Sequence, residues 1–280
     1  MSRHSGWKAL PALVLGAFFC TQNSPAIAAE TQPSCKVPNE LTRLDRPLSH
    51  VAQRLLAHEP VKIVAIGSSS TAGAGASSPA ASYPSRLEAD LRQRFPESSI
   101  TVVNRGVNGE ISSEMIARFE TDVFSEKPDL VLWQVGSNSV LRDHPLLPQT
   151  ALIHEGVKQI KAANADVVLI NLQFAPKILA KADAEGMVTL IDVAAKETNV
   201  GVFHRFSIMR HWRETRQLPF ETFITADGLH LNDWGYDCWA KLLSGAIAEA
   251  ATRPALSATV APHIAAPTAP IVPASGIPAP

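Results

Sequence analysis

A serine-rich loop near residue 70 carries the first groups that could do chemistry. The segment Gly67-Ser68-Ser69-Ser70-Thr71 follows a short apolar run, and its glycine allows a tight turn. A serine hydroxyl becomes a strong nucleophile when a neighbouring base removes its proton. No Gly-Lys-Ser/Thr sequence follows, which excludes a Walker phosphate loop. The loop is therefore a candidate nucleophile loop, and its alternative is a flexible Ser/Gly turn.

A candidate base lies near the other end of the chain, in Asp227-Gly228-Leu229-His230. Three residues of separation across a glycine turn let the carboxylate of Asp227 fold back onto the imidazole of His230, which orients a base and stabilises its cation. The alternative is a plain Asp-Gly turn with an incidental histidine. No His/Cys group has the spacing of zinc ligands, so we expect no metal and no cofactor.

Two other loops offer donors for an oxyanion. These loops are Asn104-Arg105-Gly106-Val107-Asn108-Gly109 and Gly136-Ser137-Asn138. A glycine N–H can approach a ligand closely, and an asparagine amide donates without carrying charge. Each loop alone is more often a simple turn. Together with a serine and a histidine, they favour acyl-transfer chemistry.

Short β-branched apolar runs alternate with helix-like segments, which predicts an α/β fold with a parallel sheet covered by helices on both faces. Ligands bind beyond the carboxyl ends of such strands, so Ser69, Gly109 and Asn138 should share one edge. We expect strands at Val61–Ile66, Ile100–Val103, Leu130–Val135, Val167–Leu172 and Val200–Phe203. We expect helices at Pro84–Phe95, Ser112–Phe124, Thr150–Ala163, Asp183–Thr198 and, capped by Asn232, Asp233–Ala250.

Both ends of the 280-residue chain differ from its middle in composition. Residues 1–29 combine a basic start, an apolar stretch and a small-x-small site, which is typical of a signal peptide, so we expect export to the periplasm or the exterior. The apolar stretch is shorter than the roughly 20 residues of a membrane span, so we expect no transmembrane segment in the mature chain. Residues 253–280 are predicted to be a disordered Pro/Ala-rich tail. An N-terminal arm at 30–60 and a hydrolase domain at 61–252 complete the predicted organisation.

The net charge and the cysteines limit which partners and which cellular compartment are expected. The net charge is −1, and no basic block indicates nucleic acid, so we expect no nucleic-acid partner. Without the signal peptide, Cys35 and Cys238 remain, an even pair in a compartment that tolerates disulfides. A bridge between them would tie the arm to the last helix, and two free thiols are the alternative.

The motifs, taken in order, resemble the blocks of the SGNH or GDSL hydrolase superfamily over about residues 61–250. The matching segments are Gly67-Ser68-Ser69-Ser70-Thr71, Asn104-x-Gly106-x-x-Gly109, Gly136-Ser137-Asn138 and Asp227-x-x-His230. The resemblance implies a flavodoxin-like three-layer α/β/α fold with about five strands. It also implies Ser69 as nucleophile, His230 as base and Asp227 as its orienting group. The Ser69 N–H, the Gly109 N–H and the Asn138 side chain would form the oxyanion hole.

Two positions depart from the usual family pattern. Ser68 stands where the family usually has the Asp of Gly-Asp-Ser, and Ser139 stands where many members have Asp. Neither position carries one of the functions above. Ser68 and Ser70 flank the proposed nucleophile, and the alignment of the first block favours Ser69.

The expected activity is that of a secreted serine esterase without a cofactor, acting on a small-molecule, glycan or lipid ester. An O-acetyl or short-acyl ester of a carbohydrate or cell-envelope glycan is the first expectation. A lipase-like or lysophospholipase activity, or a non-catalytic envelope-binding protein that keeps the fold, are the alternatives.

The segment 203–223 carries apolar residues every three positions with arginines between them. As a lid it would line an acyl pocket and attract an anionic substrate. As an amphipathic surface helix it would only cover the core. The candidate lining residues are Phe206, Met209, Arg210 and Trp212.

Overall fold

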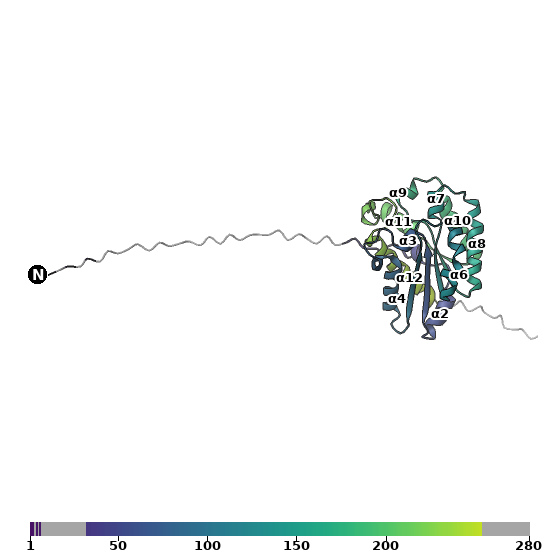
Figure 1. Ribbon diagram of the computed structural model, residues 1–280, viewed down its shortest axis with the longest axis horizontal. Coiled ribbons are helices and arrows are strands. Elements are labelled where there is room, and N and C mark those ends of the chain that lie inside the picture. The colour runs from purple at the N-terminus through teal and green to yellow at the C-terminus, as the bar shows by residue number, and fades with distance from the viewer. Residues whose placement is uncertain (3, 5, 7–31, 254–280) are drawn as a thin grey trace, which may run out of the picture. The chain divides into compact units, whose positions relative to one another are not determined.

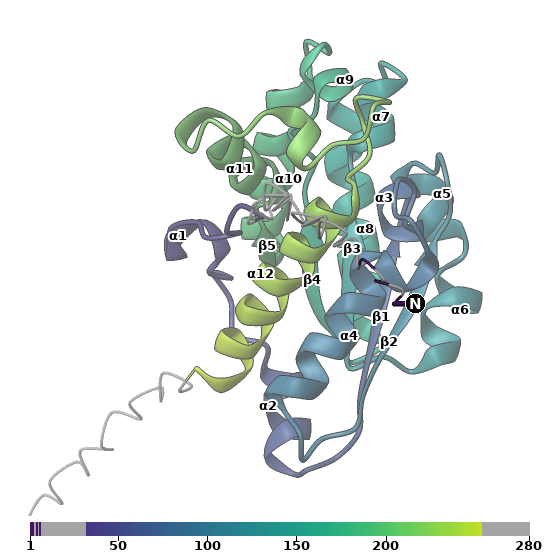
Figure 2. The same cartoon turned by 90° about the vertical axis from the view of Figure 1, so that its left-hand side faces the viewer.

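Five strands form one parallel sheet in the order β2-β1-β3-β4-β5, and Figure 2 labels them. The computed structural model describes residues 1–2, 4, 6 and 32–253. The order is that of flavodoxin-like sheets, with the change of direction between β1 and β3. The predicted α/β fold is thereby confirmed. The strands are β1 (Val61–Gly67), β2 (Ile100–Gly106), β3 (Leu130–Gln134), β4 (Asp166–Ile170) and β5 (Gly201–Phe203).

Helices cover both faces of the sheet (Figure 1). One face is covered by α4 (Tyr83–Arg94) and α12 (Asp233–Thr252), and the other by α8 (Leu147–Ala162) and α10 (Ala184–Thr198). The helix α2 (Ser49–Leu56) lies at the amino end of the sheet (Figure 2). The shorter helices are α1 (Asn39–Thr42), α3 (Ser69–Ala72), α5 (Ser112–Ala117), α6 (Phe119–Asp122), α7 (Ser137–Leu141), α9 (Pro176–Leu179) and α11 (Arg205–Arg210). Single turns or short helices of other types are η1 (Pro79–Ala81), η2 (Phe124–Glu126), η3 (His211–Thr215) and η4 (Phe220–Thr222).

The inner strands explain the apolar runs of the sequence. Every residue of β3 is buried, and so are all but one in each of β1 and β4. A strand covered on both faces has no solvent-facing side for alternate polar side chains, so it is mostly apolar. The strand β2 lies at the edge and is half-exposed, which accommodates Asn104 and Arg105 near its end.

Several predicted boundaries differ from the structure for identifiable reasons. The strand β4 begins at the polar Asp166, because its carboxylate accepts hydrogen bonds from the backbone N–H groups of His50 and Val51 at 3.0 Å each and so docks α2. The predicted helix Ser112–Phe124 is broken into α5, α6 and the turn η2. The predicted cap is present: the side chain of Asn232 accepts from the N–H of Gly235 at 3.0 Å.

The N-terminal arm is part of the same core as the sheet. Leu44, Leu48 and Val51 are at most 2 % exposed. A disulfide joins Cys35 to Cys238 in α12, across 203 residues of sequence. The arm is therefore held to the last helix by both apolar contact and a covalent bond.

The predicted signal peptide and tail are not open to structural description. Apart from residues 1–2, 4 and 6 the segment 1–29 lies outside the described residues, as do residues 254–280 of the tail. Among the helices that the structure does describe, none combines the length and the apolar character that a membrane crossing requires.

Replacing Cys35 and Cys238 together by alanine is expected to lower the free energy of unfolding by about 2–4 kcal/mol, because the bridge closes a long loop and restricts the unfolded chain. Urea unfolding of the variant beside the oxidised wild type measures the change. Reductant should bring the wild type to the variant's midpoint. Coincident unfolding curves for variant and oxidised wild type would contradict this role for the bridge.

Candidate active site

The loop after β1 presents the Ser69 hydroxyl at the carboxyl edge of the sheet. Gly67 ends the strand opposite Gly106 of β2, and Ser69 begins the short helix α3. The first N–H groups of a helix have no acceptor within it, so the N–H of Ser69 is available to a ligand. The hydroxyl Oγ of Ser69 lies 2.8 Å from Nε2 of His230.

The turn that carries His230 is organised by the carboxylate of Asp227. Its Oδ1 accepts from the N–H groups of Leu229 and His230 at 2.8 and 3.0 Å and from the hydroxyl of Thr225 at 2.7 Å. Its Oδ2 lies 2.5 Å from Nδ1 of His230. Gly228 has φ +70°, which the tight turn requires and which favours glycine. One carboxylate therefore shapes the turn and orients the imidazole.

These contacts lower the pKa of the Asp227 carboxyl. Partial burial alone would raise it, since burial disfavours the charged form. Hydrogen bonds from the backbone and ring of His230, from Thr225 and from Leu229 outweigh burial and hold the pKa well below the ordinary aspartate value. The carboxylate is thus ionised next to the imidazole at every pH near neutrality, as a group that stabilises an imidazolium must be.

The nucleophile loop and the histidine turn touch directly. Gly75 has φ +90°, and a side chain there would collide with the carbonyl of Leu231 and approach Cβ of His230. The hydroxyl of Tyr236 donates to the carbonyl of Ala74 at 2.7 Å. The glycine thus permits the close approach, and the first turn of α12 holds it.

Two candidate oxyanion donors lie on neighbouring loops at the same edge. Gly109 has φ +82°, and within residues 32–253 its N–H has no hydrogen-bond acceptor. The side chain of Asn138, in α7 after β3, donates one N–H to the carbonyl of Glu110 at 2.8 Å. That bond leaves its second N–H for a ligand and ties the two loops together.

Two arginines that sequence reasoning did not single out support the Gly109 loop. Arg118 donates three bonds of 2.7–3.0 Å to the carboxylate of Glu110 and one of 2.8 Å to the carbonyl of Arg105. Arg142 donates to the carbonyl of Gly109 at 2.6 Å. Their signal in the sequence was weak because Arg118 lies between α5 and α6 and Arg142 directly follows α7, so neither belongs to the motif that it supports.

The candidate lid residues lie mostly in the core. Phe206, Met209 and Trp212 are 0–2 % exposed, and Arg210 forms an ion pair with Glu185 and lies over the rings of Phe174 and Phe206. The segment runs as α11 and then as the π-helix η3. This placement favours the amphipathic-helix alternative over a lid that lines a pocket with these apolar side chains.

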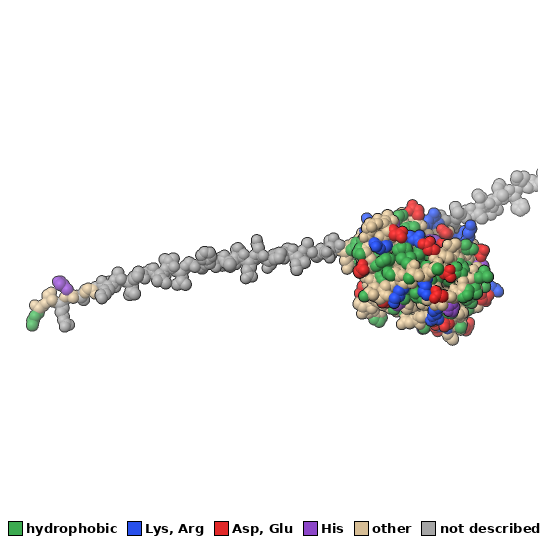
Figure 3. Space-filling view, turned by 90° about the horizontal axis from the view of Figure 1, so that it is seen from above, with side chains coloured by type: hydrophobic (Ala, Val, Ile, Leu, Met, Phe, Trp, Pro, Cys, Tyr) green, Lys and Arg blue, Asp and Glu red, His purple; other side chains and the backbone are tan. Residues whose placement is uncertain are grey.

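The surface above the sheet edge shows no single dominant charge. Figure 3 views this side, where hydrophobic patches are interspersed with acidic and basic side chains. The neutral pattern agrees with the absence of a nucleic-acid motif.

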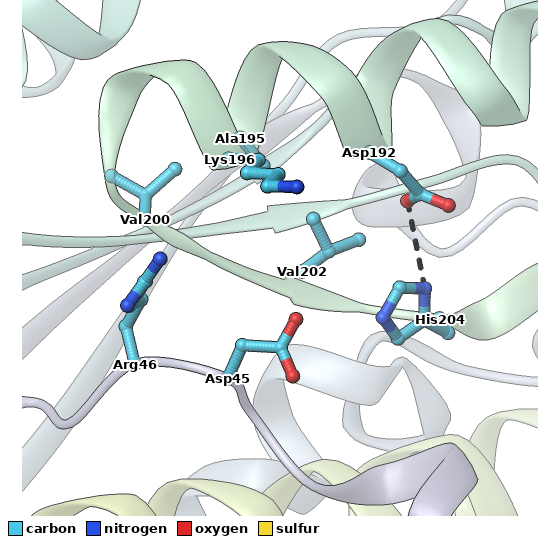
Figure 4. Close-up of a pocket in the computed structure, with 8 residues that line it drawn as sticks. All are labelled: Asp45, Arg46, Asp192, Ala195, Lys196, Val200, Val202 and His204. Atoms are coloured by element: carbon cyan, nitrogen blue, oxygen red, sulfur yellow. Dashed lines mark ion pairs between the residues drawn. The ribbon is translucent and has the colours of Figure 1, made fainter.

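A hollow of about 500 Å³ lies apart from the serine, beside the edge strand β5 and helix α10 (Figure 4). In it Nδ1 of His204 lies 3.5 Å from Oδ1 of Asp192, and the carboxylate of Asp45 faces the same ring. No group of three His, Cys, Asp or Glu side chains suited to a metal ion occurs among the described residues. The hollow offers an ion pair, and its lining residues include no serine, threonine or cysteine.

The chain belongs to the non-GDSL lipase-like family, whose family model matches residues 34–253. This membership agrees with the resemblance to the SGNH or GDSL superfamily and with the serine in place of aspartate at residue 68. The matched range covers nearly all of the described fold, from the arm to the end of α12.

Three similar proteins are esterases. An acetylxylan esterase of Geobacillus stearothermophilus is 41% identical over 56 residues, 20% of this chain and 26% of that protein. An arylesterase of Vibrio mimicus is 30% identical over 95 residues, 34% of this chain and 46% of that protein. The chain thus matches less than half the length of either relative. The crystal structure of a two-domain esterase active on acetylated mannans, co-crystallised with mannopentaose, has a TM-score of 0.62 at 22% identity and covers 75% of this chain and 56% of that one. That likeness shows a shared fold.

The lowered pKa of Asp227 predicts how steeply the rate of ester hydrolysis falls as the pH decreases. Because hydrogen bonds hold the pKa of Asp227 well below the ordinary aspartate value, this carboxylate should add no step to the acid side of the profile, and log kcat/KM for ester hydrolysis should fall with a slope no steeper than about one down to about pH 4. Steady-state kinetics with a circular-dichroism check on folding measure the slope. A slope approaching two before the fold is lost would contradict the assignment, because it would mean that Asp227 also titrates.

Proposed function

We propose that the protein is a serine esterase that cleaves its substrate through an acyl-enzyme on Ser69. The single observation that carries the proposal is the hydrogen-bonded row of Asp227, His230 and Ser69, with distances of 2.5 and 2.8 Å. A base that touches a serine hydroxyl and is itself oriented by a carboxylate is the arrangement that activates a serine nucleophile.

The reaction follows from the places of these groups. Oγ of Ser69 attacks the ester carbonyl while its proton passes to Nε2 of His230. The carbonyl oxygen becomes negative and is stabilised by the N–H groups of Ser69 and Gly109 and by the free N–H of Asn138. The imidazolium gives its proton to the leaving alcohol, which departs. Water then attacks the acyl-enzyme with His230 as base, and the serine is released with the acid.

We propose an acetyl or other short-acyl ester of a carbohydrate as the substrate. Support comes from the relatives, an acetylxylan esterase and an esterase active on acetylated mannans. Further support comes from the burial of Phe206, Met209 and Trp212, which pack in the core and so do not themselves line an acyl groove. The family description as lipase-like keeps a longer-chain activity as the second candidate.

Export to an oxidising compartment belongs to the same proposal. The disulfide between Cys35 and Cys238 supports it, since such bonds persist in secreted and periplasmic proteins and are rare in the cytosol. The signal-peptide pattern at residues 1–29 points the same way.

Ser69→Ala is expected to lower kcat on 4-nitrophenyl acetate by about 10⁴-fold or more and to abolish labelling by a fluorophosphonate, because both need the activated hydroxyl. Ser70→Ala is the matched control, since it removes the neighbouring hydroxyl and should keep both properties. A wild-type protein that hydrolyses the ester while Ser69→Ala hydrolyses it equally well would refute the nucleophile. A wild type that is folded yet neither labels nor hydrolyses would favour the non-catalytic binding protein.

Acyl chain length separates the two enzyme candidates. On 4-nitrophenyl esters kcat/KM is expected to be highest for acetate and to fall at least about tenfold by octanoate, because the apolar residues of α11 pack in the core instead of lining an acyl groove. Assays below the micelle concentration of each ester make the comparison valid. A rise in kcat/KM with chain length would overturn the carbohydrate-acetate proposal and favour a lipase-like activity.

A further inference from the structure

Arg205 is an unusual residue for the interior of this domain. It follows β5, begins α11 and is 1 % exposed. Among residues 32–253 no carboxylate pairs with its guanidinium, which lies over the ring of Trp239 at 4.6 Å. Burial lowers the pKa of Arg205 to about 10, so the group remains a cation at neutral pH.

Stability alone does not account for this arginine. A buried cation without a counter-charge is costly, and a well-packed apolar side chain in its place is often neutral or stabilising. Its Nη1 is buried without a hydrogen-bond partner among the described residues, which adds to the cost. The contact with Trp239 offsets part of it. The arginine is therefore explained by the groups that its other two nitrogens, Nε and Nη2, bind.

Those donors fix the orientation of Gln173. Nε of Arg205 donates to the carbonyl of Asn171 at 3.1 Å, and Nη2 donates to Oε1 of Gln173 at 2.9 Å. A guanidinium can only donate, so the amide oxygen of Gln173 must face it. The amide nitrogen then faces the carbonyl of Leu229 at 3.5 Å. Besides the arginine, only this long contact with the Leu229 carbonyl distinguishes the two ends of the amide.

From Gln173 the polar contacts continue toward the nucleophile. The hydroxyl of Ser137 donates to Oε1 of Gln173 at 2.8 Å, which leaves its oxygen to accept from Nε2 of Gln134 at 3.4 Å. Oε1 of Gln134 then accepts from the N–H and the hydroxyl of Ser68 at 2.9 and 3.0 Å. These donor directions agree along the row: Arg205 fixes its Gln173 end, and the N–H of Ser68 fixes its Gln134 end. In a buried row such bonds reinforce one another.

The row meets the backbone immediately before three groups of the proposed site. Ser68 precedes Ser69, Ser137 precedes Asn138, and Leu229 precedes His230. The side chains of Ser68, Gln134, Ser137, Gln173 and Arg205 are at most 3 % exposed, so water does not compete for these bonds. The serine at residue 68 suits its partner, because its hydroxyl donates to the amide oxygen of Gln134 as an ionised carboxylate could not.

We infer that Arg205 is a positioning residue, which anchors the Gln173 end of this buried row and thereby helps to hold the nucleophile loop, the Asn138 loop and the histidine turn in one arrangement. The inference rests on the proposed function, since it concerns the same serine. It assigns a task to a side chain that touches neither the substrate nor the reacting atoms.

Arg205→Met tests this assignment, because methionine keeps an unbranched apolar stem but removes the guanidinium and every donor. The variant should unfold at a temperature close to that of the wild type, while kcat on 4-nitrophenyl acetate falls by about 10–100-fold with KM within about twofold. The rate constant for fluorophosphonate labelling should fall in parallel. Arg205→Lys restores one donor and is expected to give intermediate rates.

A folded Arg205→Met variant with wild-type kcat and labelling rate would overturn the positioning role and leave the esterase proposal standing. A wild type that neither labels nor hydrolyses would overturn both. The two failures are therefore distinguishable.

Ser137→Ala decides the question if Arg205→Met does not fold. It removes one hydroxyl in the middle of the row and should lower kcat by about tenfold with KM nearly unchanged. Ser244→Ala is the matched control, because Ser244 is also fully buried and hydrogen-bonded but lies in α12, where it contacts Arg94. Equal kcat values in the two serine variants would overturn the proposal.

Discussion

The hydrogen bond between Ser69 and His230 is the interaction on which the rest of the structure depends. It joins loops 161 residues apart, and neither loop could hold its partner alone. The parallel sheet brings the loop after β1 to the same edge as the turn before α12, and Gly75 lets the two backbones approach closely. Asp227 then fixes the ring by one contact and the turn by three. The active geometry is thus a property of the fold as a whole.

Two groups of polar contacts support the loops that form this bond, one near the surface and one in the interior. Near the surface, Arg118 holds Glu110 and with it the Gly109 loop. In the interior, Arg205 and Gln173 lie behind the histidine turn. Both arginines work through hydrogen bonds of fixed direction, which specify one arrangement where apolar contact would tolerate several. An active site that needs sub-ångström placement benefits from such constraint.

Much of the architecture could be predicted because it depends on local pattern. The strands β1 and β3 are mostly apolar since both are covered on both faces, and the loops after them carry motif residues. The cap at Asn232 was likewise readable from one residue type at one position. The supporting side chains were not, because Arg205 and Gln134 have no motif around them and acquire their partners only when distant strands pair. The polar start of β4 at Asp166 was missed for the same reason.

Similarly, the spacing of apolar residues around Trp212 could not separate a lid from a core-facing helix. A lid and a core-facing helix both have an apolar residue at every third or fourth position, on one face of the helix. Whether that face packs against the core depends on how the arm and α12 pack against it. In the structure that side faces the core, with Trp212 in edge contact with Phe223 and Trp234. A pattern of this kind predicts a helix reliably, but what it packs against depends on tertiary contacts.

A crystal structure of the protein after reaction with a fluorophosphonate tests the central claim most directly, because the adduct imitates the tetrahedral intermediate. We expect phosphorus bonded to Oγ of Ser69 and the phosphoryl oxygen about 3 Å from the N–H of Gly109 and the side-chain nitrogen of Asn138, with the His230 ring still beside Oγ. An adduct on Ser70, or a phosphoryl oxygen that points away from both donors, would contradict the account.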